Sequence, residues 1–201
     1  ALSRRSIAQH TMTSDTGTPN GSGHILVVGA GQAGVQSAEA LRTLGFEGRI
    51  TVLGDEAHGP YHRPPLSKAW LAGEIAAAQL VMRSAEALAR KNIELRTLVR
   101  VSRIHRAQRQ LELADGTRLD YTGLVLATGS TPRGLSLPGA QSTGVLALRS
   151  LDDASAIAAR LTLCQEQQRS VVVIGGGFIG LEVAATARKK GLNVTVLEAE
   201  I

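Results

Sequence analysis

The sequence predicts an α/β protein with two βαβ units, each built around a central parallel sheet. Apolar β-forming residues at 25–28 run directly into Gly29-Ala30-Gly31-Gln32-Ala33-Gly34. A segment with apolar residues at helical spacing follows, and a second apolar strand comes at Ile50–Leu53. The same order of strand, glycine motif, helix and strand recurs between Val171 and Glu198. The two copies lie too far apart for a solenoid repeat, so they predict two similar domains.

Each glycine of the first motif has a physical reason. Gly29 permits the tight turn after the strand, Gly31 lets the backbone approach a diphosphate, and Gly34 lets the helix pack closely on the strand. A diphosphate there would meet the free N–H groups and the positive end of the helix. Strand, G-x-G-x-x-G and helix in this order are the dinucleotide-binding fingerprint in its required context. Gly175, Gly177 and Gly180 repeat it, and the alternative is two tight turns without a ligand.

Composition sets the class of protein. The chain of 201 residues is 43% hydrophobic, which suffices for a core, and it has no apolar stretch long enough for a membrane span. We expect no membrane partner. The single cysteine, Cys164, excludes a disulfide framework and fits a reducing compartment, so we expect a cytoplasmic protein. Cys164 shares the apolar face of a predicted helix with Ile157 and Leu161, which favours a buried filler over a nucleophile.

The net charge of +5 is unevenly distributed. Two acids, Glu86 and Glu94, lie among eight basic residues between positions 83 and 109: Arg83, Arg90, Lys91, Arg96, Arg100, Arg103, Arg106 and Arg109. One interpretation is a solvated strand and helix face, and the other is a positive patch for an acidic partner. Nucleic acid is disfavoured as a partner because aromatic residues, which stack on bases, are only 2% of the chain.

Before the second motif the chain should alternate loops and short elements. We expect disorder in residues 1–23, which are polar and lack hydrophobic periodicity. In the proline-rich segment 57–73, a short helix begins at Pro65 and presents Lys68. His58 and His62 have no carboxylate or cysteine partner nearby, so we expect loop histidines and no metal site.

The following residues should form small elements that lead to the second unit. We expect a helix at Ser84–Lys91, a strand at Ile93–Ile104 and a hairpin around Asp115-Gly116. A strand at Leu124–Leu126 should end in Ala127-Thr128-Gly129, followed by loop and short strand over 133–150 and a helix over 152–168. Since the chain stops right after the second unit's second strand, we expect an N-terminal part of a longer polypeptide with an incomplete second domain.

Four motifs in this order carry a resemblance to a family: GAGQAG, RPPLSK (Arg63–Lys68), LVLATGSTPR and VVVIGGGFIG. Over residues 24–201 the sequence resembles the FAD-dependent pyridine nucleotide–disulfide oxidoreductases. The RPPLSK motif is similar to that of the ferredoxin and rubredoxin reductases that serve oxygenases and cytochrome P450 systems. The resemblance implies the first part of a Rossmann-like FAD-binding domain at 24–150 and the start of an NAD(P)H-binding domain at 151–201.

The resemblance also implies residues that bind the cofactors. Asp55 would bind the adenosine ribose, although Gly54 stands where Glu198 stands in the second unit, so the acid is displaced by one position. Val101 would offer its backbone to the adenine. The remaining implied FAD-binding residues are Gly29, Gly31, Ala33, Gly34, Arg63, Lys68, Thr128, Gly129 and Arg149. Those implied for the nicotinamide nucleotide are Gly175, Gly177, Gly180, Glu182 and Glu198.

Two of these residues are the candidate catalytic pair. By the resemblance, Lys68 would sit beside the flavin N5 and Glu182 near the nicotinamide. An ammonium there favours the negative charge of reduced flavin, and a carboxylate can orient the lysine. The alternatives are an exposed helix lysine and a first-turn acid that stabilises its helix. Glu198 would accept both ribose hydroxyls and repel a 2′-phosphate, which predicts NADH as the cofactor in preference to NADPH.

The absence of a cysteine pair narrows the reaction that the resemblance implies. Without C-x-x-C the flavin has no dithiol relay, so electrons would leave one at a time to an acidic iron–sulfur protein, a ferredoxin or rubredoxin. The alternatives are an NADH-linked nitrite reductase or NADH oxidase, an apoptosis-inducing-factor-like flavoprotein, and an inactive nucleotide-binding module.

Overall fold

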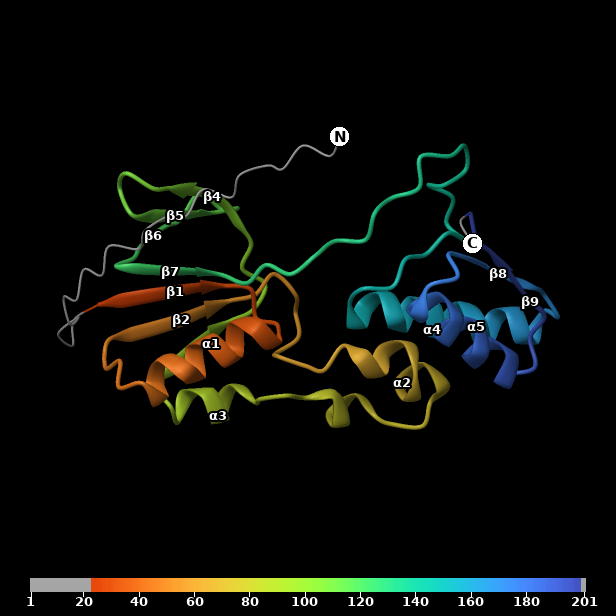
Figure 1. Ribbon diagram of the computed structural model, residues 1–201, viewed down its shortest axis with the longest axis horizontal. Helices are drawn as coiled ribbons and strands as arrows, with labels where there is room; N and C mark the ends of the chain where they lie inside the picture. Colours follow the sequence, from red (N-terminus) through yellow and green to blue (C-terminus); the bar gives the residue numbers. More distant parts are fainter. Residues whose placement is uncertain (1–22, 200–201) are drawn as a thin grey trace, which may run out of the picture.

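The computed structural model describes residues 23–199. The predicted disorder over residues 1–23 falls almost wholly outside this range. The chain forms two lobes, shown at the two ends of Figure 1. The first lobe is organised by a four-stranded parallel sheet, and the second lobe by helices packed on a two-stranded parallel sheet. Within residues 23–199, no helix is long and apolar enough to cross a membrane.

The first lobe contains the first βαβ unit. Strands β1 (His24–Val28) and β2 (Arg49–Leu53) pair in parallel and are joined by α1 (Gln32–Thr43). Strand β3 (Ile93–Arg96) pairs with β2 and β7 (Gly123–Leu126) with β1, in the order β3-β2-β1-β7.

Both faces of this sheet are covered. Helices α1 and α3 (Ala85–Ala89) lie on one face in Figure 1, where Val27, Ile50 and Val52 are buried. The antiparallel strands β4 (Val101–His105), β5 (Gln110–Leu113) and β6 (Arg118–Asp120) lie on the other, against Leu26 and Leu53. Successive residues of a strand point to opposite faces, so an uninterrupted apolar run is what a doubly covered sheet requires.

The second lobe contains the second βαβ unit. Strands β8 (Val171–Ile174) and β9 (Val194–Leu197) pair in parallel and are joined by α5 (Phe178–Lys189). Helix α4 (Leu151–Glu166) precedes them and is capped by Ser150. Its buried Ile157 and Leu161 pack with Ala187 and Leu192, and Cys164 lies half-buried against the same cluster, which confirms its predicted place on the apolar face.

A segment that lies between β2 and β3 in the sequence packs on the second lobe. It forms the 3₁₀ helix η1 (Pro64–Ser67), helix α2 (Ala69–Ala72) and a second 3₁₀ turn, η2 (Ala77–Leu80). Leu71 of α2 is buried with residues of α4 and α5. The excursion carries residues 67 and 68 from the first lobe to the side of α5, where Glu182 lies.

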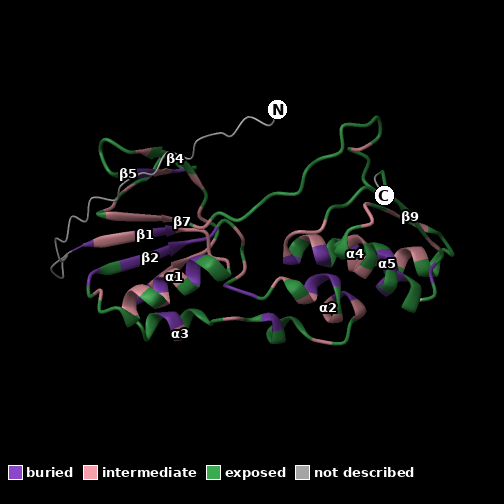
Figure 2. Ribbon diagram, viewed as in Figure 1, coloured by how far each residue is buried: buried purple, intermediate pink, exposed green. Residues whose placement is uncertain are grey.

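Two sequence predictions of local structure were wrong. Residues 93–104 form two strands in different sheets, because the backbone turns at Leu98, which has a left-handed φ of 56°. The amides of Leu98 and Val99 donate to the loop after β2, to the carbonyls of Glu56 and Gly54. Residues 127–150 contain no strand; they cross between the lobes as an extended connection, exposed along most of its length (Figure 2).

Candidate functional site

A first cavity of about 270 Å³ lies at the carboxyl ends of the parallel strands. Three loops line it: the first glycine motif after β1, the loop after β2, and the loop after β7. Of the predicted FAD-binding residues, it brings together Gly29, Gly31, Ala33, Asp55, Arg63, Thr128, Gly129 and Arg149. Ligands of open α/β sheets bind at this edge, so the position suits a nucleotide.

The glycines of the first motif divide into two kinds. A Cβ on Gly29, whose φ is 112°, would lie 2.1 Å from the Ala127 carbonyl oxygen, and a Cβ on Gly34 would lie 1.9 Å from the Gly29 carbonyl oxygen. These two glycines are required by the protein's own packing. A Cβ on Gly31 would meet no atom within 4 Å. Gly31 is the N-cap of α1 and has no side chain that could bind the free N–H groups of the first turn. These N–H groups therefore face open space, which suits a diphosphate.

The second motif shares the geometry of the second and third glycines, but a Cβ on its first glycine, Gly175, would meet no atom within 4 Å. A Cβ on Gly180 would lie 2.1 Å from the Gly175 carbonyl oxygen, whereas one on Gly177 would meet nothing within 4 Å. Gly175 has a φ of 106°. The Glu198 carboxylate accepts hydrogen bonds from the Gly176 and Ala199 amides. The three glycines and Glu198 are not among the residues that line the first cavity or the second cavity described next.

A second cavity, of about 320 Å³, contains the predicted catalytic pair. Lys68 Nζ lies 2.9 Å from Glu182 Oε1, so the ion pair joins the excursion of the first lobe to α5 of the second. The Ser67 hydroxyl, which is buried, donates to the other carboxylate oxygen of Glu182 at 2.5 Å. The Ser67 hydrogen bond, then the Lys68 ammonium, hold the pKa of Glu182 below its usual range. Glu182 is therefore ionised at neutral pH and Lys68 keeps its partner.

The two cavities share a wall. Arg63, Pro64 and Arg149 line both, so the space beside Lys68 and Glu182 adjoins the first cavity. The Gly129 Cα faces Arg149, since a Cβ there would lie 3.0 Å from Arg149 Nη2.

Comparison with known protein families identifies a family for nearly all of the described residues. A profile of the pyridine nucleotide-disulphide oxidoreductase family matches residues 23–200. The chain belongs to this family.

Among the relatives of this family member, the rhodocoxin reductase of Rhodococcus erythropolis is 47% identical over 175 residues, which cover 87% of this chain and 40% of that protein. The putidaredoxin reductase of Pseudomonas putida is 44% identical over 182 residues, 89% of this chain and 42% of that protein. The crystal structure of a covalent putidaredoxin reductase–putidaredoxin complex matches with a TM-score of 0.79 at 44% identity, covering 88% of this chain and 42% of that one. The chain spans about 40% of the length of these curated relatives.

Two predicted site residues of this family member differ from the others: Val101 lines neither cavity, and Asp55 has a partner of its own. Val101 begins β4 and packs on the Leu26–Leu53 cluster, and it lines neither cavity. Asp55 lines the first cavity, but its exposed carboxylate lies 3.6 Å from Arg100 Nη1. Within the described residues, no group of three or more His, Cys, Asp or Glu side chains is placed to hold a metal ion.

The basic segment 83–109 does not form a single patch. Arg83 and Lys91 both pair with Glu39 of α1, and Arg96 pairs with Glu94. Arg83, Arg90 and Lys91 flank α3, and Arg100, Arg103 and Arg106 lie in or beside β4. Helix α3 and strand β4 lie on opposite faces of the first sheet (Figure 1). Its charge is therefore divided between two surfaces and partly compensated.

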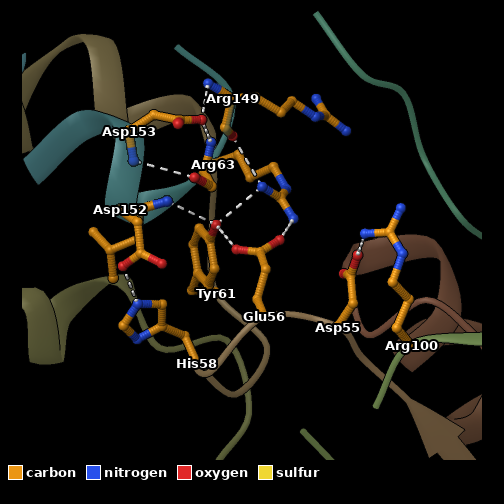
Figure 3. Close-up of polar contacts among 11 residues, drawn as sticks. Asp55, Glu56, His58, Tyr61, Arg63, Arg100, Arg149, Asp152 and Asp153 are labelled. Carbon is orange, nitrogen blue, oxygen red and sulfur yellow. Dashed lines mark hydrogen bonds and ion pairs between the residues drawn. The ribbon is translucent and has the colours of Figure 1, made fainter. Parts of the chain in front are cut away.

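Sequence reasoning missed Glu56 and Tyr61, which also line the first cavity. The Tyr61 hydroxyl donates to Glu56 and accepts from Arg63, and Figure 3 shows these side chains converging. The guanidinium of Arg63 also donates to Glu56 and to the carbonyl of Arg149. The sequence offered one signal: an acid, a tyrosine and an arginine lie within eight residues before the RPPLSK helix.

Proposed function

We propose that this protein is part of a flavoprotein reductase that takes electrons from NADH, holds FAD, and passes electrons to a ferredoxin or rubredoxin of an oxygenase or cytochrome P450 system. The observation that carries the proposal is the Lys68–Glu182 pair at 2.9 Å, which joins the two glycine-motif units beside a cavity. The names of the relatives support it, since rhodocoxin reductase and putidaredoxin reductase are named for the carriers they reduce.

Groups that line the first cavity would bind FAD. Bare backbone at Gly31 and the first turn of α1 would bind the diphosphate, and Asp55 would bind the ribose. Arg149 and the Thr128–Gly129 loop would bind the part of the cofactor that extends toward the second cavity. When bound, FAD would supply two-electron acceptance from NADH and one-electron release to an iron–sulfur carrier.

Lys68 and Glu182 would set the electrostatics of the reaction. The Lys68 ammonium would place a positive charge where negative charge develops on the reduced cofactor. Glu182 would orient Lys68 through one oxygen and would itself be held by Ser67 through the other. Because the lowered pKa favours the ionised form of Glu182, its carboxylate would remain available to Lys68 over the neutral pH range.

The second motif would hold the nicotinamide nucleotide. Gly175, Gly177 and Gly180 would bind its diphosphate in the manner of the first motif, and Glu198 would bind the ribose hydroxyls and repel a 2′-phosphate. We assign residues 24–150 to the FAD-binding domain and residues 151 onward to the NADH-binding domain. A cytoplasmic location is part of the proposal, because the single cysteine and the need for NADH suit that compartment.

Rapid-mixing kinetics test the proposal. The full-length protein should purify yellow, and NADH should bleach its flavin absorbance on mixing, faster than NADPH does. Subsequent reoxidation should be fast with an acidic ferredoxin or rubredoxin and slow with O₂ alone. Rapid O₂ consumption without any carrier would favour the oxidase alternative. A colourless protein with no affinity for added FAD would contradict the proposal.

A further inference from the structure

The first lobe is tied to the start of α4 through one buried hydroxyl. Tyr61 is 7% exposed, and its hydroxyl has three partners, two in its own loop and one at the start of α4. It donates to Glu56 Oε2, and it accepts from Arg63 Nη1 at 2.9 Å and from the buried Leu151 amide at 3.0 Å. A phenol has one donor and two acceptor sites, so every hydrogen-bonding site of this hydroxyl is used. Burial, with the Glu56 carboxylate as a second cause, raises the pKa of Tyr61 and keeps the proton in place.

Arg63 extends the connection to the backbone of Arg149. Its Nη1 donates to the Arg149 carbonyl at 2.9 Å, while Nη2 contacts Glu56 Oε1. Its guanidinium lies over the Tyr61 ring, 4.9 Å from the centroid, and so cannot turn away without losing that contact as well.

Residues 149–153, which Tyr61 and Arg63 contact, are also held by hydrogen bonds of their own. The Asp153 carboxylate accepts from the amides of Arg149 at 3.0 Å and Ser150 at 2.8 Å, and the Ser150 hydroxyl caps the Asp153 amide. The backbone of Arg149 is thus fixed through both its amide and its carbonyl. Figure 3 shows its side chain extending away from these contacts, and it lines both cavities.

A second connection runs parallel to the first. His58 Nε2 lies 2.8 Å from Asp152 Oδ1 in the first turn of α4, and the His58 ring meets the Tyr61 ring edge to face with centroids 6.2 Å apart. His58 and Tyr61 both line the first cavity, so the wall of that cavity and the start of α4 are connected at two points.

We propose that Tyr61 is a positioning residue that, through Arg63 and the Leu151 amide, fixes Arg149 against the flavin nucleotide and sets the placement of the second lobe relative to the first. The inference rests on the proposed function for the identity of the ligand. In this proposal Arg149 contacts the cofactor, and Arg63 acts indirectly by holding the backbone of Arg149.

The test is a double-mutant cycle in the full-length protein with FAD titrated into apoprotein. Tyr61→Phe keeps the ring and removes the hydroxyl, and Arg63→Lys keeps the charge but cannot reach both Glu56 and Arg149. Each variant should bind FAD about tenfold more weakly. The double variant should bind FAD only slightly more weakly than the single variant with the lower FAD affinity, because both residues act through the same contact. Tyr121→Phe, the same chemical change at the chain's other tyrosine, should bind FAD like the parent.

A second readout needs no cofactor. Hydrogen exchange at the Leu151 amide in apoprotein should be at least tenfold faster in Tyr61→Phe and unchanged in Tyr121→Phe. If Tyr61→Phe does not fold, Glu56→Gln replaces it in the FAD titration, with the same tenfold loss expected. The inference is overturned by FAD losses that multiply in the double variant, by parent-like FAD affinity of Tyr61→Phe or its replacement, or by unchanged exchange at Leu151. A parent that takes up no FAD contradicts the proposed function, and the exchange comparison then decides the inference.

Discussion

A methyl group at Gly31 should separate cofactor binding from folding. In Gly31→Ala the new Cβ enters space in which no protein atom lies within 4 Å, and the backbone at φ −77° and ψ −174° suits alanine. Alanine is a poorer first-turn cap than glycine but lowers the entropy of the unfolded chain, so the free energy of unfolding should change by no more than about 0.5 kcal/mol.

In the proposed FAD site, the same methyl group would occupy the place of the diphosphate. A backbone N–H bond to a charged group contributes about 1.5–3 kcal/mol, so losing one such bond should weaken FAD binding by roughly 10- to 150-fold. The measurements are thermal unfolding without FAD and a titration of FAD by flavin fluorescence.

Two other glycines supply the contrast. In Gly34→Ala the Cβ lies 1.9 Å from the Gly29 carbonyl oxygen, a backbone atom, so α1 must move and the unfolding free energy should fall by about 3 kcal/mol. Gly134→Ala adds a methyl group in open space on the crossing segment and should change neither quantity. The reasoning is refuted if Gly31→Ala binds FAD with parent affinity, or if it loses as much stability as Gly34→Ala.

Three further predictions concern titrating groups and specificity. Ser67→Ala removes the hydroxyl that lowers the pKa of Glu182, so in the pH profile of flavin reduction by NADH the acidic limb should move to higher pH. Desolvation raises the pKa of Glu94, but hydrogen bonds from Arg96, Arg49 and Thr51 outweigh it and leave a value of about 2. Its contribution to stability is present above the unfolded pKa and lost as the pH falls toward 2. With discounting for its partial exposure, the parent should lose about 1 kcal/mol more than Glu94→Gln between roughly pH 5 and pH 2 in denaturant titrations. Glu198→Ala should reduce the preference for NADH over NADPH, measured as the ratio of kcat/KM values, about tenfold.

Each of these predictions has a control and a contradictory result. Ser155→Ala removes a helix hydroxyl that donates to Leu151, and it should leave the pH profile in place; a profile unchanged in Ser67→Ala would contradict the role of that hydroxyl. Glu74 is an exposed and weakly paired acid, so Glu74→Gln is the control and should lose as much stability in acid as the parent does. If Glu94→Gln also lost as much stability as the parent, the prediction for the low pKa of Glu94 would be contradicted. Equal efficiency of the parent with both nicotinamide cofactors would contradict the role of Glu198.

The glycine motifs could be predicted because their spacing is local. Strand, turn and helix follow within a dozen residues, and the steric roles of Gly29 and Gly34 depend on neighbours close in the sequence or in the adjacent strand loop. The Lys68–Glu182 pair was expected from family resemblance, and the structure places the two side chains in contact. Their meeting depends on the excursion through α2, whose apolar Leu71 indicates burial but not which lobe covers it.

Other features had no sequence signal of sufficient strength. Leu98 is an apolar residue in a left-handed conformation, and no glycine, asparagine or proline marks that turn, so residues 93–104 were predicted as one strand. The Tyr61 contacts join residues about ninety positions apart. Hydrogen bonds between side chains and a distant backbone depend on the tertiary fold, and periodicity carries no information about them.

The wall that the two cavities share has a thermodynamic consequence. Arg63, Pro64 and Arg149 line both spaces, so a ligand in one cavity that moved these side chains would alter the wall of the other. If FAD and NADH bind as proposed, linkage requires reciprocity: the factor by which bound FAD changes the equilibrium affinity for NADH equals the factor by which NADH changes the affinity for FAD. In the proposed reductase, these three side chains would set the size of that coupling.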